Sequence, residues 1–384
     1  MNLSVKIILL IFFDIIVFAN GTTQAQAHAG EDCEELFDSK KYSDSFSACQ
    51  KACSMDIGPG CSNLGELYQS GVGAQQDYGK AKSLYEKACN LRDGHGCYGL
   101  GFLYEIGLGV QQDYGKAKSF YEKANLFYEK DCNTGSGAAC NALGLAYQKG
   151  KIVERSEIKA KDLYEKSCNS NYYFGCLNLG FLYYKGKDVE QDYGKTKSIL
   201  ERLCDLNYHI GCVNRGLLYE NVERDYSRAK SIYEKACDLN EGLGCLALAV
   251  LYHEGRKEVV QDYSMASALY KKSCNLNEGL GCNNLAYLYE YGQGSQADIA
   301  KPLYEKACNM GAFAGCINLG RFYYNGYGVS RDHRKARTLW EMACKLDAEN
   351  GCDYYNALIK HEADASLSIY QQWFSYPRVF FYFD

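Results

Sequence analysis

The sequence predicts an all-α solenoid of helix pairs stapled by disulfides. Nine cysteine pairs share a C-x7-C spacing, the pairs recur about every 36 residues, and one small residue returns in each period. A period of this length is typical of repeats built from two helices. The chain has 384 residues with 47% hydrophobic content, which excludes global disorder. Its net charge is −5, and the mild acidity is spread along the chain. The sequence therefore gives no sign of the basic face that nucleic acid binding needs.

Residues 1–29 have the pattern of a secretory signal peptide. Lys6 precedes the apolar run 7–13, which resumes after Asp14, and small residues stand at 25, 27 and 29 as a signal peptidase requires. The alternative is an uncleaved membrane anchor, but a spanning helix needs roughly 20 apolar residues. No second apolar stretch of that length follows. We therefore expect an exported chain without a stable membrane span after signal cleavage.

The cysteine spacing indicates disulfides. A zinc site needs four ligands at short spacings such as C-x2-C, and none occurs, whereas an exported chain favours disulfides. Each bond would tie the end of one helix pair to the start of the next. The remaining two cysteines lie on antiparallel helices of the N-terminal cap, so we pair them as well. The expected bonds, which leave no free thiol, are Cys33–Cys49, Cys53–Cys61, Cys89–Cys97, Cys132–Cys140, Cys168–Cys176, Cys204–Cys212, Cys237–Cys245, Cys274–Cys282, Cys308–Cys316 and Cys344–Cys352.

The unit 316–344 illustrates one repeat. Apolar or small residues at i, i+3, i+4 and i+7 from Cys316 predict an amphipathic helix. A glycine-rich loop follows, and Asp332 stands at a capping position before the second helix. Glycine costs about 1 kcal/mol inside a helix, so its return indicates a close helix crossing. The recurring small residues are Gly65, Gly101, Gly144, Gly180, Gly216, Ala249, Ala286 and Gly320.

Two repeats depart from the period. The interval from Cys89 to Cys132 is 43 residues because seven residues were duplicated: the sequence of 120–123 returns unchanged at 127–130. Seven inserted residues are two helical turns and preserve the buried face to within about 20°. The interval of 33 after Cys204 reflects a shortened loop. We expect a shortened capping repeat at 30–60, eight repeats over 61–351, and a C-terminal capping helix with an aromatic tail over 352–384.

The string Leu179-Gly180-Phe181-Leu182-Tyr183-Tyr184-Lys185-Gly186, followed by Asp192-Tyr193-Gly194-Lys195, resembles Sel1-like repeats, which are relatives of the tetratricopeptide repeat. With the export signal and the C-x7-C pairs, the chain resembles the Helicobacter cysteine-rich protein family. The resemblance covers about 53–352 and implies a right-handed α-solenoid. It also implies penicillin binding, weak β-lactamase activity and an interaction with host cells, but it places no catalytic motif on particular residues.

No motif in the chain supports a hydrolase. The S-x-x-K strings 156–159 and 227–230 have the spacing of a serine β-lactamase, but neither Ser-Asp-Asn nor Lys-Thr-Gly occurs. We interpret both strings as solvated helix positions. The six His form no H-x-H or H-E-x-x-H pair, and 109–116 departs from a phosphate-binding loop, with Ala117 where Ser or Thr should hold magnesium. We expect no metal and no cofactor, and an enzyme activity rests on the resemblance alone.

A recurring asparagine points to binding. It lies two residues after the cysteine that opens the first helix, although asparagine is a mediocre helix former. First helices of tetratricopeptide-like solenoids line the concave groove, where Asn can pair with a ligand's backbone amide. The alternative is a structural asparagine that bonds the neighbouring repeat. The candidate ligand-binding residues are Asn63, Asn178, Asn214, Asn284 and Asn318.

The recurring tyrosine of the first helix is expected in the core rather than in a ligand platform; examples are Tyr68, Tyr104, Tyr183, Tyr219, Tyr252, Tyr289 and Tyr323. The aromatic tail 373–383 is expected to cover the last repeat, since a solenoid needs capped ends.

The sequence therefore predicts an exported repeat scaffold, secreted or periplasmic, that binds an extended peptide or cell-wall-derived ligand in its groove. The alternative, implied by the resemblance, is a β-lactamase that hydrolyses the β-lactam ring. The expected partners are a peptide, a protein, or a peptidoglycan-like or β-lactam ligand, with no nucleic acid, and we expect a monomer.

Overall fold

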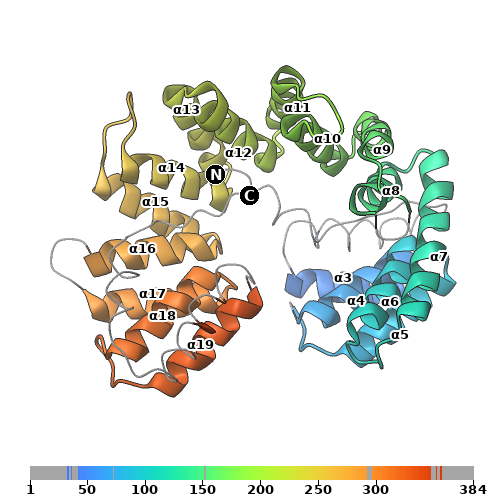
Figure 1. The fold of residues 1–384 in the computed structure, drawn as a ribbon, viewed down its shortest axis with the longest axis horizontal. Coiled ribbons are helices and arrows are strands. Elements are labelled where there is room, and N and C mark those ends of the chain that lie inside the picture. Colours follow the sequence, from blue (N-terminus) through green and yellow to red (C-terminus); the bar gives the residue numbers. More distant parts are fainter. Residues whose placement is uncertain are drawn as a thin grey trace. The chain divides into compact units, whose positions relative to one another are not determined.

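The computed structural model describes residues 33, 36, 42–71, 73–150, 153–291, 296–346, 352 and 355–356. The signal segment 1–29 and the aromatic tail lie outside these residues. Regular structure in the described part is helical (Figure 1), and an Arg256–Val259 bridge is its only β-type pairing. The helices are α3 (Tyr42–Ser54), α4 (Gly58–Ser70), α5 (Tyr78–Asn90), α6 (Gly94–Ile106), α7 (Tyr114–Asn133), α8 (Gly137–Lys149), α9 (Glu157–Asn169), α10 (Tyr173–Lys185), α11 (Tyr193–Asp205), α12 (His209–Leu218), the π-helix η2 (Tyr219–Glu223), α13 (Tyr226–Asp238), α14 (Gly242–Glu254), α15 (Tyr263–Asn275), α16 (Gly279–Tyr291), α17 (Ala297–Asn309), α18 (Phe313–Asn325) and α19 (His333–Leu346).

The chain divides into two compact units that meet at the Ile199–Leu200 bond. Within each unit, a helix packs on the helices next to it in sequence. The even-numbered helices also touch one another, as α4 does with α6, α8 with α10, and α12, α14, α16 and α18 in turn. We call these even-numbered helices the first-helix layer, and α3, α5 and the later odd-numbered helices the second helices. Nearest-neighbour packing is the signature of a solenoid, so the expected right-handed, disulfide-stapled α-solenoid is confirmed.

Ten disulfides join all twenty cysteines. Eight of them connect a second helix to the next first helix across a tight turn; in the Cys237–Cys245 bond the Cα atoms are 4.5 Å apart. Each of these turns contains one residue in the left-handed region of φ. Asparagine and glycine tolerate that conformation best. The residues are Asp56, Arg92, Gly135, Asn171, Asn207, Asn240, Asn277 and Gly311.

In five first helices the recurring small residue is a glycine that lies against an aromatic ring of its own repeat. A Cβ added to Gly65 would lie 2.8 Å from the Tyr85 ring, and one added to Gly144 would lie 2.5 Å from the Tyr164 ring. The rings are fully buried, so they cannot move aside freely. In these repeats, the close helix crossing expected from the sequence is therefore a contact between a helix backbone and an aromatic ring.

The two irregular repeats fold as their lengths indicate. The seven-residue insertion makes α7 a single helix of 20 residues, whereas most other helices have 13. In the shortened repeat, α12 runs directly into η2, and Arg224 ends it in the left-handed region with φ 56°. Asp332 accepts the Lys335 backbone N–H at 2.9 Å and caps α19 as expected. In the part of the chain that the structure describes, no helix has the length and apolarity to cross a membrane.

Candidate functional site

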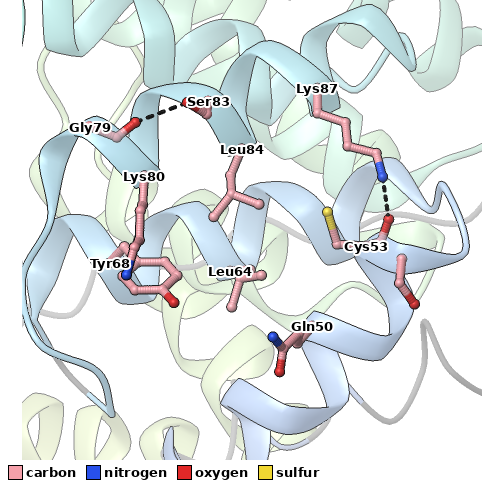
Figure 2. Close-up of a pocket in the computed structure, with 10 residues that line it drawn as sticks. Gln50, Cys53, Leu64, Tyr68, Gly79, Lys80, Ser83, Leu84 and Lys87 are labelled. Atoms are coloured by element: carbon pink, nitrogen blue, oxygen red, sulfur yellow. Dashed lines mark hydrogen bonds between the residues drawn. The ribbon is translucent and has the colours of Figure 1, made fainter.

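One pocket lies between the second helices α3 and α5, above α4 (Figure 2). Its volume is about 470 Å³. The leucines Leu64 of α4 and Leu84 of α5 face each other across its floor, and Tyr68 lies beside them. Lys80 and Lys87 of α5 stand at its two ends. The lining is completed by Gln50, Cys53, Ser54, Gly79 and Ser83.

The tyrosine of this pocket belongs to the series that was expected in the core. Tyr183, Tyr219 and Tyr323 are buried, whereas Tyr68 and Tyr104 are only partly buried. In six repeats, a cation at the third position of the second helix lies over this ring at 4.2–5.8 Å. The pairs are Lys80–Tyr68, Lys116–Tyr104, Lys159–Tyr147, Lys195–Tyr183, Arg228–Tyr219 and Lys335–Tyr323. One side of the ring therefore packs in or near the core, and its face contacts a cation at the surface.

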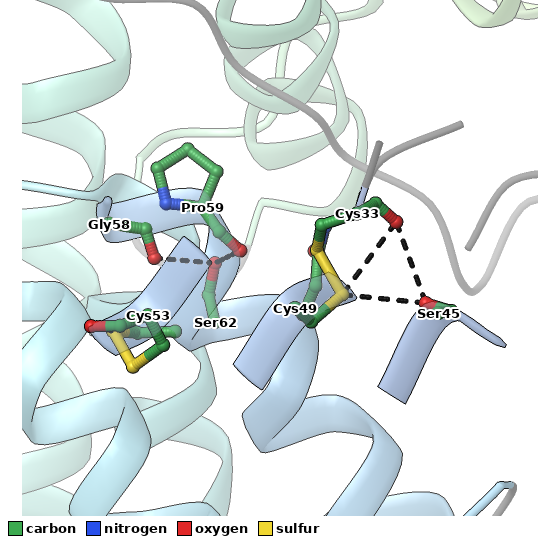
Figure 3. Close-up of a disulfide and its surroundings, with 9 residues drawn as sticks. Cys33, Ser45, Cys49, Cys53, Gly58, Pro59 and Ser62 are labelled. Carbon is green, nitrogen blue, oxygen red and sulfur yellow. Dashed lines mark hydrogen bonds between the residues drawn. A yellow bond between two sulfur atoms is a disulfide. The ribbon is translucent and has the colours of Figure 1, made fainter. Parts of the chain in front are cut away.

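The asparagines of the first helices are largely buried, and their surroundings differ. Asn63 donates from Nδ2 to the sulfur of Cys33 over 3.7 Å, next to the Cys33–Cys49 disulfide. Figure 3 shows this disulfide with Ser45, whose Oγ lies 3.5 Å from the Cys33 carbonyl oxygen. Asn63 of α4 therefore helps to hold Cys33, which the disulfide ties to Cys49 of α3.

Two of the candidates bond the preceding repeat. Asn178 Nδ2 donates to Asn141 Oδ1 at 2.7 Å, and Asn318 Nδ2 donates to Asn283 Oδ1 at 2.9 Å. Asn141 and Asn283 occupy the fifth position of α8 and α16, one place before the recurring asparagine. Neither Asn141 nor Asn283 was singled out from the sequence. The signal that could have found them is an asparagine at the fifth position of the first helix one repeat earlier. Asn178 and Asn318 thus fit the alternative in which the asparagine bonds the neighbouring repeat.

Asn214 and Asn284 have no asparagine at the fifth position of the preceding first helix. At the fifth position, the sequence before Asn214 has Leu177, and the sequence before Asn284 has Leu246. Asn284 Oδ1 instead accepts from its neighbour Asn283 at 3.1 Å. Asn214 is 7% exposed, and its Oδ1 atom is buried without a hydrogen-bond partner among the described residues. Among the described residues, Asn214 is thus the one candidate with a buried acceptor that has no hydrogen-bond partner.

The residues considered for hydrolysis have structural uses. Ser156 caps α9 by accepting the Lys159 backbone N–H at 3.2 Å. Ser227 is exposed in the first turn of α13, and Lys230 pairs with Glu234 at 3.7 Å. These contacts agree with solvated helix positions. No group of three or more metal-ligating side chains comes together in the described ranges.

A buried ion pair lies in the first-helix layer of the C-terminal unit, where sequence reasoning did not look. Arg321 of α18 pairs with Glu290 of α16 at 2.5 Å, and Tyr304 donates to the same carboxylate at 2.7 Å. Arg321 also donates to the Tyr291 hydroxyl. Burial acts to lower the pKa of Arg321, but Glu290 outweighs it and the pKa is raised. Because each charge is satisfied within the protein, this cluster locks α16 to α18.

The fold and its covalent ties define a class: an α-solenoid of helix pairs in which a disulfide joins each repeat to the next. The Sel1 repeat family model matches eight segments of the chain, 58–93, 94–125, 137–172, 174–208, 209–241, 242–278, 279–311 and 314–347. The chain belongs to the Sel1 repeat family. No curated protein sequence matches it significantly.

Three solved structures illustrate what the chain is similar to. A protective antigen of uropathogenic Escherichia coli strains that displays an SLR fold is 24% identical, with 88% of this chain and 84% of that chain covered and a TM-score of 0.47. A Sel1 repeat protein from Oxalobacter formigenes is 22% identical, covering 74% and 96%, with a TM-score of 0.39. Helicobacter pylori cysteine rich protein B is 32% identical over 35% of this chain and 98% of its own, with a TM-score of 0.28.

Proposed function

We propose that the protein is an exported scaffold whose first-helix layer binds an extended peptide segment of a partner protein. The observation that carries the proposal is the unused Oδ1 acceptor of Asn214. A buried polar atom without a partner costs about 1–3 kcal/mol. A peptide backbone N–H would remove that cost, because an asparagine amide can accept and donate at once.

The surroundings of Asn214 are apolar. Val213 and Leu217 flank it on α12, and α14 contributes Leu246 and Val250 at the corresponding positions. These four side chains are buried within the protein, so we assign the contact with the peptide backbone to the Asn214 amide, which can accept and donate at once.

The Cys-rich fold supports a site of action outside the cytoplasm. Disulfides persist in secreted and periplasmic proteins and are rare where thiols are kept reduced. The ten bonds and the signal-like segment 1–29 together support the proposal of a secreted or periplasmic protein.

The experiment compares two asparagines that the sequence makes equivalent. Peptides are selected on the oxidised protein from a random 12-residue display library, and a selected peptide is titrated against the parent, Asn214→Ala and Asn178→Ala. Asn214→Ala should weaken binding by roughly 0.5–1.5 kcal/mol, the value of one neutral hydrogen bond. Its melting temperature should stay the same or rise, because no partner is left behind.

Asn178→Ala is the matched control. It should lower the melting temperature, because the amide of Asn141 loses its donor, and it should leave the affinity unchanged. If Asn214→Ala binds the peptide as tightly as the parent protein, or if it loses as much stability as Asn178→Ala, the peptide-binding role of Asn214 is wrong.

A further inference from the structure

We propose that the pocket between α3, α4 and α5 binds an amphiphilic carboxylate, a molecule with an unbranched apolar chain and one terminal carboxylate. The pocket lies on the second-helix side of the N-terminal unit and does not involve Asn214. This proposal is therefore independent of peptide binding by the first-helix layer.

The floor of the pocket is apolar. Leu64 and Leu84 meet across it, and the Tyr68 ring extends it (Figure 2). Phe46 of α3 packs edge-on against Tyr68 with ring centroids 5.5 Å apart. A cavity of about 470 Å³ lies within the range of small-molecule sites, in which apolar walls supply most of the affinity.

The two lysines at the ends of the floor differ. Lys87 Nζ is held by the Cys53 carbonyl oxygen at 2.7 Å and by Asp56 at 2.7 Å. Lys80 Nζ lies over Tyr68, is 3.7 Å from Asp77, and has a side chain that is 61% exposed. Lys80 is therefore the cation that can turn toward a carboxylate. Since the lysines are seven residues apart on α5, the floor spans about 10.5 Å, the length of a chain of about ten carbons.

Two sequence changes on α3 make this pocket unlike its neighbour. Phe46 stands where α5 has Lys82, and Gln50 stands where α5 has Glu86. The first change adds apolar surface. The second removes a carboxylate that would repel an anion. In the groove between α5 and α7, moreover, Phe120 takes the place of Leu84 and stacks on Tyr104 at 5.7 Å. An open apolar floor without a facing carboxylate at this position thus distinguishes the first groove from the next.

The test uses decanoate, titrated calorimetrically into the oxidised protein, with decyltrimethylammonium as a probe of equal chain length and opposite charge. Decanoate should bind, and the ammonium should bind at least about tenfold more weakly. Leu84→Phe should abolish binding, because it reproduces the filled groove of Phe120. Lys80→Gln should weaken binding about fivefold, the factor that corresponds to an exposed ion pair.

Lys116→Gln is the matched control, because Lys116 lies over Tyr104 as Lys80 lies over Tyr68. It should leave decanoate binding unchanged. If Leu84→Phe lowers the melting temperature, Ser83→Leu blocks the same pocket from an exposed rim position. The proposal is overturned if the parent protein does not bind decanoate, if the two lysine variants weaken binding equally, or if a blocked pocket still binds it.

Discussion

At the residue scale, a tyrosine hydrogen bond recurs through the solenoid. The tyrosine at the eighth position of a second helix donates to a Gln or Glu at the twelfth residue from the start of the first helix, which for Glu220 lies in η2, at 2.6–3.1 Å. The pairs are Tyr85–Gln69, Tyr121–Glu105, Tyr164–Gln148, Tyr233–Glu220 and Tyr304–Glu290. Where the second helix has Leu200 or Trp340 instead, the first helix has Tyr184 or Tyr324. The donor and the acceptor therefore change together, as a buried polar pair requires.

Gly144→Ala and Gly180→Ala should have different effects on stability. A Cβ at Gly180 would lie 3.6 Å from Ile199, in ordinary contact, but one at Gly144 would lie 2.5 Å from the Tyr164 ring. Gly180→Ala should raise the free energy of unfolding by up to about 1 kcal/mol, since alanine is the better helix former. Gly144→Ala should gain nothing or lose stability. Equal shifts of the melting temperature in the two variants would contradict the tyrosine contact.

Asp93 is a buried cap of α6. Its Oδ1 accepts the His95 backbone N–H at 3.0 Å, and its Oδ2 is buried without a hydrogen-bond partner among the described residues. Burial raises the pKa of Asp93 above its usual 3.8. Between 3.8 and the raised pKa, the folded protein binds more protons than the unfolded chain. The free energy of unfolding therefore falls as pH rises through this window and stays lower above it.

Asp93→Asn should stabilise the protein at neutral pH, because the amide keeps the cap and carries no buried charge. The gain should shrink as pH falls through the window and vanish below 3.8. Asp113→Asn is the control, because the hydrogen bond from Lys116 N–H lowers the pKa of that exposed cap. Its carboxylate contributes stability above the usual pKa, so Asp113→Asn should lose stability at neutral pH. Melting temperatures between pH 3 and 7 test both signs.

At the scale of elements, each disulfide ties a second helix to the next first helix. In the Cys237–Cys245 bond, both sulfurs are buried at the junction of α13 and α14. The bond closes a nine-residue loop, for which the chain-entropy model gives about 2.5 kcal/mol. Since repeats interact only with their neighbours, the effect of removing one bond should be local.

The double variant Cys237→Ala/Cys245→Ala should lose about 2.5 kcal/mol of stability at this junction. Amide hydrogen exchange should accelerate in α13 and α14 and remain slow in α4 to α8, which keep their own bonds. Uniform acceleration along the chain, or none at the junction, would show that the bond does not stabilise this element individually.

At the scale of the whole molecule, the disulfides form a continuous covalent series. They reinforce a fold in which each helix pair buries its apolar face on its neighbours. The oxidised protein, unfolded without reductant and treated with iodoacetamide, should show no added mass, because all twenty cysteines are bonded. Two or more alkylated thiols per chain would contradict this pairing.

The sequence by itself determined the repeat, the helix pairs and the nine C-x7-C disulfides. These features are local: the spacing places both cysteines on either side of one turn, and the seven-residue copy in α7 adds two turns to one helix. The family followed from the same pattern. The candidate site was only partly predictable, because the five recurring asparagines look alike in sequence.

Only the tertiary structure decided which asparagine has a use within the protein. Asn178 and Asn214 occupy the same position, yet Asn178 bonds Asn141 and the Asn214 oxygen has no partner among the described residues. Likewise, the open groove at Leu84 depends on the space between α3, α4 and α5. Hydrogen-bond satisfaction and cavity volume depend on groups about 20 to 40 residues apart that meet only after the repeats stack, so the period of the sequence does not contain them.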